Sequence, residues 1–204
     1  MLKILINETD DMFRRGMKYF LSDFFCKRFN LQIEFITDYT PENISIADVI
    51  ILSLCNGERY TCFPELRARR KGIIIGLVDE NNFNERSPLC FADIVYIVRR
   101  APLKEITHQL TIAWLKWVVS EGFAGYKSCL GCRHNTLSLQ QREVMTGLYL
   151  GRSVQEVATN MKVSYKTVTA HKYVVMRKFN LKNDYDLFRF LGKLREKSGS
   201  VLFM

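Results

Sequence analysis

The chain has 204 residues, of which 48% are hydrophobic and 25% charged, and this balance excludes a disordered or collagen-like protein. At roughly 100–200 residues per domain, the length allows one large domain or two small ones. Lysine and arginine outnumber aspartate and glutamate by 30 to 21, no signal peptide is evident, and no apolar run approaches the ~18 residues of a membrane helix. We therefore expect a cytoplasmic protein with no membrane contact.

The first 120 residues alternate short apolar runs with helical patterns. Nearly continuous apolar runs, such as 49–52, are typical of strands that are covered on both faces in a parallel sheet. A helix is predicted at 103–119, whereas 37–47 and 78–93 look too irregular for full helices. The pattern predicts a doubly wound α/β domain over residues 1–120 with a five-stranded parallel sheet. Its strands are predicted at 2–6, 31–36, 49–52, 73–75 and 94–98.

Residues 121–136 contain three glycines and little periodicity, which is typical of a linker. Cys129, Cys132 and His134 lie in this stretch, but a tetrahedral zinc site needs four ligands and only three occur locally. Thiols beside apolar runs are usually small buried hydrophobes, and we read three other cysteines in this way: Cys55, Cys62 and Cys90. We expect no metal site and no cofactor, and we leave open whether Cys129 and Cys132 have a redox or metal role.

Residues 137–204 show purely helical periodicity and hold 12 Lys+Arg against 5 Asp+Glu, a net charge of +7. A Ser or Asn three positions before an acid or amide marks three of the helix starts as capping boxes. Gly151 is expected to end the first helix. Four helices are predicted, at 138–150, 153–161, 164–179 and 183–194. Only Lys162-Val163 joins the middle pair, which predicts a helix-turn-helix.

The helix from Ser164 to Phe179 has two different faces when it is projected at 100° per residue. Val168, His171, Val175 and Phe179 fall on one side and are expected to pack inward. The other side mixes cations, hydroxyls and one small residue, which suits phosphate and base-edge contacts in the major groove of DNA. A solvated helix face is the alternative. The predicted DNA-binding residues are Ser164, Lys166, Thr167, Thr169, Ala170, Lys172, Tyr173 and Arg177.

An apolar stripe on the last helix is the candidate dimer interface. It consists of Leu187, Phe190, Leu191 and Leu194. Two copies of the reading helix would place contacts about one turn of DNA apart, as two-fold operators require. The alternative is that the stripe completes the core of the domain itself.

A series of short motifs runs through the whole helical part of the sequence: Leu137-Ser138, Arg142-Glu143-Val144, Gly151-x-Ser153, Glu156-Val157-Ala158, Val163-Ser164, Thr167-Val168-x-x-His171 and Lys178-Phe179. With these motifs, residues 137–194 resemble the helix-turn-helix domain of LuxR/NarL-type transcription factors. By this resemblance, the helix from Ser164 is the recognition helix. Thr169, Ala170 and Tyr173 take base-contact positions, Lys166 and Thr167 contact the DNA backbone, and the last helix dimerises. Val174 departs from the usual Asn of the family.

The first domain also carries three short motifs: Phe13-Arg14-x-Gly16-Met17, Asp48 to Leu52 and Ala101-Pro102. With these motifs it resembles a receiver domain of two-component response regulators, with a flavodoxin-like fold. Phosphoryl transfer in a receiver needs two metal-binding acids, an acceptor Asp and a Lys that neutralises charge. This chain has Glu8 and Thr9 at the acids, Ser53 at the acceptor and Arg99 at the lysine. The sequence therefore predicts a pseudo-receiver that is not phosphorylated on aspartate.

Together these features predict a transcription regulator that binds double-stranded DNA as a homodimer or as a heterodimer with a related regulator, and that is not an enzyme. Two alternatives remain: a conventional phosphorylated response regulator, and a co-regulator that acts mainly by heterodimerisation and binds little DNA itself. A flavodoxin-like enzyme is disfavoured because residues 7–11, which follow the first strand, read Asn-Glu-Thr-Asp-Asp and would repel phosphate.

Overall fold

The computed structural model describes residues 1–80, 88, 90, 93–120, 132 and 134–198. The chain forms two compact units, each treated separately below. The α/β unit comprises Met1–Leu54 and Cys62–Arg133, and the helical unit comprises Cys55–Thr61 and His134–Met204. The short segment Cys55–Thr61 lies within the domain predicted for residues 1–120, yet it groups with the helical unit.

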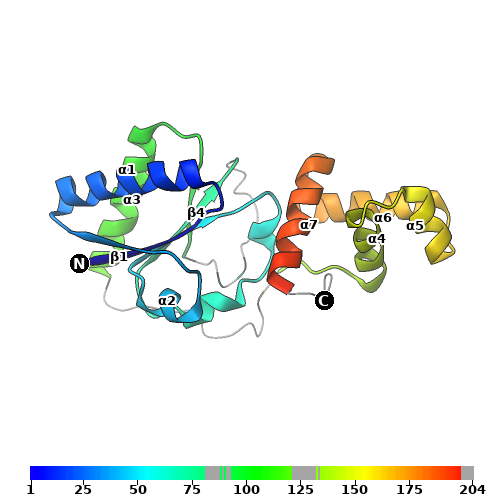
Figure 1. The fold of residues 1–204 in the computed structure, drawn as a ribbon, viewed down its shortest axis with the longest axis horizontal. Coiled ribbons are helices and arrows are strands. Elements are labelled where there is room, and N and C mark those ends of the chain that lie inside the picture. Colours follow the sequence, from blue (N-terminus) through cyan, green and yellow to red (C-terminus); the bar gives the residue numbers. More distant parts are fainter. Residues whose placement is uncertain (81–87, 89, 91–92, 121–131, 133, 199–204) are drawn as a thin grey trace. The chain divides into compact units, whose positions relative to one another are not determined.

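The α/β unit is built on a five-stranded parallel sheet with the strand order β2-β1-β3-β4-β5 (Figure 1). Ile4 of β1 pairs with Val49 of β3, and Ile51 of β3 pairs with Ile75 of β4. The predicted doubly wound α/β fold is therefore confirmed. The strands are β1 Leu2–Asn7, β2 Ile33–Ile36, β3 Val49–Ser53, β4 Ile73–Val78 and β5 Val95–Val98.

Helices cover both faces of this sheet (Figure 1). Helices α1 (Asp11–Phe29) and α3 (Leu103–Val119) pack on the face that carries Ile4 and Ile51. The short α2 (Pro41–Ile46) and the 3₁₀ helix η2 (Pro64–Ala68) pack on the other face, which carries Ile50. Since both faces are buried, successive strand residues must all be apolar, which explains the continuous apolar runs.

The stretch 37–47, predicted to be too irregular for a full helix, holds only the six-residue α2, with Thr40 as its N-cap. The second such stretch, 78–93, lies largely outside the described residues. Among the described residues, no helix is both long and apolar enough to cross a membrane.

The helical unit contains the four predicted helices around one apolar core. Val144, Val168, Val175, Leu187 and Phe190 all lie in this core and are fully buried. The predicted boundaries hold to within one residue except at the last helix, which continues to Ser198. The helices are α4 Leu139–Tyr149, α5 Val154–Met161, α6 Tyr165–Lys178 and α7 Asp184–Ser198, and η1 (Glu58–Tyr60) lies in the same unit.

Candidate nucleic-acid interface and phosphorylation site

The turn between α5 and α6 has the short connection that was predicted. Lys162 ends α5 in the left-handed conformation, and the amide of Val163 donates to the carbonyl of Ala158 over 3.0 Å. This bond satisfies a carbonyl that the helix end would otherwise leave open. Ser164 then caps α6, because its hydroxyl accepts from the amide of Thr167 over 3.2 Å. The chain can therefore turn sharply between α5 and α6.

Helix α6 is buried on one face and open on the other. Val168, Val175 and Phe179 lie in the core, as predicted, and His171 is half-buried. The exposed residues include most of the predicted DNA-binding set, and Tyr173 leaves 59% of its surface accessible. The open residues of that set are Ser164, Lys166, Thr167, Ala170, Tyr173 and Arg177, while Thr169 is half-buried. Cations, hydroxyls and a tyrosine thus share one outward surface.

Two residues of this surface differ from the expectation. Lys172 is half-buried, and its ammonium forms an ion pair with Asp184 of α7 over 2.7 Å, so its charge is balanced within the domain. Tyr165 is 55% exposed at the start of α6, although it was not predicted as a DNA contact. At 100° per residue it lies about 40° from Thr169, so the helical projection could have included it. Val174, at the position where LuxR-type proteins usually have Asn, is also exposed.

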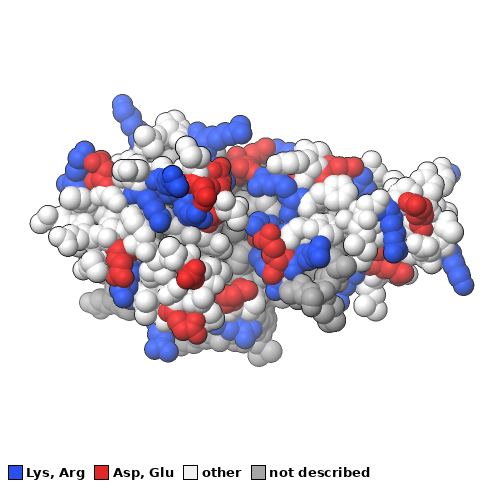
Figure 2. Space-filling model, in the orientation of Figure 1, with Lys and Arg blue, Asp and Glu red and all other residues white. Residues whose placement is uncertain are grey.

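The charge of the molecule is not gathered into one patch on the face that Figure 2 shows. Lysine and arginine alternate there with acidic side chains. The positive excess of residues 137–204 therefore provides a general attraction for a polyanion.

The candidate dimer residues on α7 are used inside the domain. Leu187, Phe190 and Leu191 are fully buried in the helical core, and Leu194 packs against that core from a half-buried position. This arrangement matches the stated alternative, in which the stripe completes the core. The large apolar side chains that α7 does expose are Tyr185 and Phe188.

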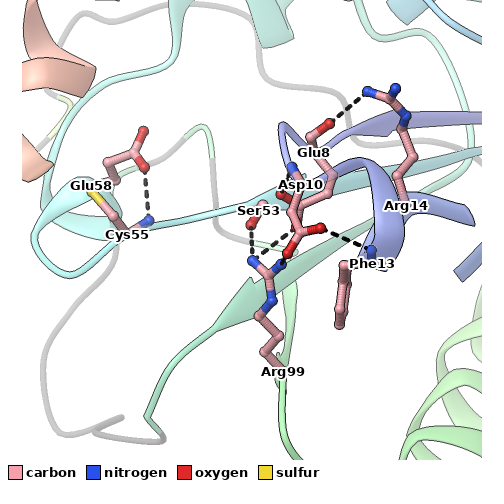
Figure 3. Close-up of polar contacts among 8 residues, drawn as sticks. All are labelled: Glu8, Asp10, Phe13, Arg14, Ser53, Cys55, Glu58 and Arg99. Carbon is pink, nitrogen blue, oxygen red and sulfur yellow. Dashed lines mark hydrogen bonds and ion pairs between the residues drawn. The ribbon is translucent and has the colours of Figure 1, made fainter. Parts of the chain in front are cut away.

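In the α/β unit, the positions of the degenerate phosphorylation site meet around one guanidinium (Figure 3). Arg99 follows β5, and its Nη1 lies 2.9 Å from an oxygen of the buried Glu8 and donates to Ser53 Oγ over 3.2 Å. Its Nη2 lies 3.2 Å from Asp10, and the guanidinium stacks 4.0 Å from the ring centre of Phe13. Three of the four predicted positions, Glu8, Ser53 and Arg99, are therefore brought together.

Asp10, and not Thr9, lies at the second acid position beside Arg99. Thr9, placed at the second acid by resemblance, is exposed. The ion pairs and hydrogen bonds described for the Arg99 guanidinium are made with Glu8, Ser53 and Asp10. Asp10 supplies the second carboxylate and also caps α1, because it accepts from the amide of Phe13 over 3.0 Å. An aspartate directly before a helix is a capping signal, and that signal could have located it. The arrangement is a cation held by two carboxylates and a hydroxyl.

The cysteines are partly described. Cys129 lies outside the described residues, whereas Cys132 is described. Cys55 is buried in the helical unit, where its amide donates to Glu58 over 2.8 Å (Figure 3), and burial raises the pKa of its thiol. A buried thiol behaves as a small hydrophobic side chain, as predicted for Cys55.

Comparison with known proteins identifies the helical unit. Residues 135–191 match the family described as "Bacterial regulatory proteins, luxR family", so this part of the chain is similar to the helix-turn-helix domains of that family. The "Transcriptional regulatory protein TdiR" of Thauera aromatica is 38% identical over 56 residues, which are 28% of this chain and 25% of that protein. The match thus spans about a quarter of that relative's length.

The similarity of fold extends over nearly the whole chain. The structure of the two-component response regulator RcsB in complex with DNA covers 95% of this chain and 98% of its own, with a TM-score of 0.53 and 19% identity. RcsB from Salmonella enterica serovar Typhimurium, bound to promoter P1flhDC with the phosphomimetic BeF3−, has the same coverage and identity and a TM-score of 0.58. The chain therefore has the fold of a receiver joined to a LuxR-type helix-turn-helix domain.

Proposed function

We propose that this protein is a transcription regulator that binds double-stranded DNA and reads the major groove with α6. The observation that carries the proposal is the division of α6 into a face buried through Val168 and Val175 and an open face with Lys166, Tyr173 and Arg177. A helix-turn-helix places its second helix in the groove in this way. The LuxR-family match and the net charge of +7 in residues 137–204 support the same function.

The test is selection of bound fragments from random duplex DNA by the full-length protein, followed by titration of a selected site at several salt concentrations. Each phosphate that is neutralised adds about −0.9 to the slope of log affinity against log salt, so we expect a slope of a few units. Lys166→Ala should weaken all sequences alike and reduce the slope by about 1. Lys193→Ala is the control, because Lys193 pairs with Glu196 on α7 and should leave the slope unchanged.

Tyr173→Ala separates the reading of bases from general attraction. A side chain at a base edge contributes about 1–3 kcal/mol of discrimination, so this variant should lose preference for the selected site and keep its affinity for random DNA. A uniform loss over all sequences would contradict the assignment of the reading face. A titration that is flat between low and moderate salt would contradict direct DNA binding altogether.

We further propose that the α/β unit works without aspartyl phosphorylation. Phosphoryl transfer needs an anionic nucleophile and a metal beside it, but Ser53 carries a neutral hydroxyl. The oxygens of Glu8 and Asp10, which could attract a metal, are already paired with Arg99. The planar guanidinium cannot simply replace the compact ammonium of a receiver lysine.

Incubation with acetyl phosphate and Mg²⁺, followed by intact-mass measurement, tests this second proposal. We expect no acid-labile phosphate on the wild-type protein, and none on Ser53→Asp, because the carboxylates of Glu8 and Asp10 are already paired with Arg99. Stoichiometric labelling of Asp10, Asp11 or Asp48 in the wild-type protein would support the conventional phosphorylated regulator instead.

Without phosphorylation, the activity of the regulator would be controlled by contact with a protein partner. The partner would be a second copy of this chain, in a homodimer, or a related regulator, in a heterodimer. Helix α3 supports it, because it exposes four large apolar side chains on one face, which is typical of a contact surface. They are Ile112, Leu115, Val118 and Val119.

A further inference from the structure

The centre of the open face of α6 is apolar. Tyr173 and Val174 follow Ala170 by three and four positions, so both side chains adjoin that of Ala170 on the helix surface. All three residues are exposed, with 59% of Tyr173 and 40% of Val174 accessible. Single exposed apolar residues are common, but a contiguous group rimmed by polar residues is typical of a contact surface. These three residues are called the apolar cluster below.

Cations lie at both ends of the apolar cluster. Lys166 precedes Ala170 by about one turn, Arg177 follows Tyr173 by about one turn, and both cations are exposed. At 100° per residue, Lys166, Ala170 and Arg177 fall within about 40° of one another. The phosphates that border a groove of duplex DNA suit two cations placed on either side of an apolar centre, and an apolar protein partner does not require them. The net charge of +7 in residues 137–204 also favours a polyanion as the occupant.

Helix α6 lacks the side chains that read adenine. Tyr165–Lys178 contains no asparagine and no glutamine, which are the residues that bond both major-groove groups of adenine. Arginine and lysine read guanine, but Lys172 is paired with Asp184, and Arg177 lies in the last turn. A recognition helix contacts bases with its N-terminal residues, and the cation there, Lys166, is assigned to the phosphates. The side chains left to meet the bases are therefore mainly apolar.

Only one group that a base pair presents in the major groove is apolar, the C5 methyl group of thymine. Small aliphatic and aromatic side chains contact this group, and the apolar cluster offers both kinds. From Ala170 to Val174 the helix axis rises about 6 Å, close to the roughly 7 Å of two base-pair steps.

We propose that α6 selects thymine methyl groups at two consecutive base pairs of each site, through Ala170, Tyr173 and Val174. This inference rests on the proposed function, because it specifies which bases the reading helix takes. The target is then duplex DNA whose sites contain neighbouring T·A pairs in contact with α6. Lys166 and Arg177 hold the helix on the phosphates, and the apolar cluster supplies the discrimination.

The test removes the methyl group and leaves the base pair unchanged. The full-length protein selects its site from random duplex DNA, and each thymine of that site is then replaced in turn by uracil, which lacks only the C5 methyl. We expect two consecutive positions at which uracil lowers the affinity about fourfold each, as for the loss of one buried methyl group. Uracil at the other thymines should have no effect. The slope of log affinity against log salt should stay the same, because no phosphate contact changes.

5-Methylcytosine supplies the opposite test. A C·G pair in place of a contacted T·A pair should weaken binding, and 5-methylcytosine in place of that cytosine returns a methyl group to the groove. We expect the methylated site to regain part of the affinity. If it regains none, the protein recognises another feature of the T·A pair, and the proposal is wrong.

Three variants assign the effect to side chains. Val174→Ala should weaken binding to the selected site and reduce its response to uracil, because the methyl groups that pack on thymine are removed. Tyr173→Phe keeps the ring and should keep the response. Leu139→Ala is the control, because it shortens a side chain that is 80% exposed on α4 and should change neither affinity nor response. Circular dichroism checks that all three variants are folded.

Two results would overturn this inference without contradicting the proposed function. A selected site that binds equally well with uracil at every position shows that α6 reads DNA without using methyl groups. An equal response of Val174→Ala and the wild type to every uracil shows that the selection does not come from the apolar cluster. If no duplex is selected at all, the proposed function fails together with this inference, and the apolar cluster is a surface for a protein partner instead.

Discussion

Arg99 holds three polar groups of the α/β unit with a single side chain. Its planar fork reaches Glu8 and Ser53 with one nitrogen and Asp10 with the other. A lysine ammonium is a single point charge and could not hold the three groups with the same geometry. The arginine therefore suits the serine and the two carboxylates that surround it.

A double-mutant cycle tests this cluster. Arg99→Ala should lower the free energy of unfolding by about 2–3 kcal/mol, because the buried Glu8 carboxylate loses its cation. Glu8→Gln in the same protein should restore part of the loss, since the neutral amide does not need a cation. Urea unfolding of the wild type, both single variants and the double variant gives the coupling energy. Strictly additive effects would contradict a direct interaction.

At the residue scale, the sequence predicted what depends on helical periodicity. The open positions of Lys166, Ala170 and Tyr173 follow from projection at 100° per residue. The pairing of Lys172 with Asp184 could not be predicted, because the two lie on different helices and their distance depends on tertiary packing. The proximity of Cys62 and Cys132 was missed for the same reason.

The helix starts of the helical unit are set by local hydrogen bonds. In the capping box of α5, the amide of Ser153 donates to Glu156 over 2.7 Å, and the Ser153 hydroxyl accepts from the amide of Glu156 over 3.2 Å. The same arrangement joins Ser138 and Gln141 at α4. These ends were predictable because both partners lie three positions apart in sequence. The short α2 was not, since six residues carry too little periodicity.

The capping box of α5 should make stability depend on pH. Hydrogen bonds from Ser153, first from its amide, lower the pKa of the exposed Glu156 below its ordinary value of 4.5. A lowered pKa in the folded state contributes stability that is complete above the unfolded pKa and is lost as the pH falls through the folded pKa. Glu156→Gln should therefore destabilise the protein at neutral pH and have no added effect in acid. Urea midpoints from about pH 7 to pH 3 measure this difference, and a constant difference would contradict it.

Gly147 lets α4 and α5 approach closely. A Cβ atom built on Gly147 would lie 2.6 Å from a methyl group of Val157, so Gly147→Ala forces the two helices apart. We expect a loss of about 1–3 kcal/mol from overpacking, which exceeds the gain of about 1 kcal/mol in helix propensity. Gly192→Ala on α7 is the control, because the nearest atom there lies 3.8 Å away, and it should be stabilising. If the midpoint temperature of thermal unfolding rises equally in both variants, the close approach of α4 and α5 is refuted.

The exposed apolar residues of α3 and α7 give two candidate contacts for self-association. Leu115→Glu changes the exposed face of α3, and Phe188→Asp changes that of α7. We expect at least one of them to yield a folded monomer, which sedimentation and circular dichroism together can identify. Phe190→Asp should instead unfold the helical unit, since Phe190 is fully buried. A folded Phe190→Asp monomer would restore the original assignment of the dimer interface.

The two units of the molecule differ in how far apart in sequence their contacting residues lie. In the α/β unit, β1 lies between β2 and β3. Ile4 must therefore pair with the distant Val49 before the centre of the sheet can form. In the helical unit, α4 to α6 follow one another closely in the chain and contact one another directly. The sequence predicted both kinds of fold, because continuous apolar runs and capped helical periods are local signals, but it did not place Cys55–Thr61 with the helices.

The two units should refold at different rates, because their contacting residues lie at different distances along the chain. Non-local strand pairing is slow, whereas nearby helices dock quickly. Both tryptophans of the chain, Trp114 and Trp117, lie on α3, so tryptophan fluorescence reports on the α/β unit alone. After dilution from urea, the helical circular dichroism signal, to which α1 and α3 also contribute, should recover in two phases, and its fast phase should precede the recovery of the fluorescence. If the two signals instead recover together, the two units fold as a single cooperative body.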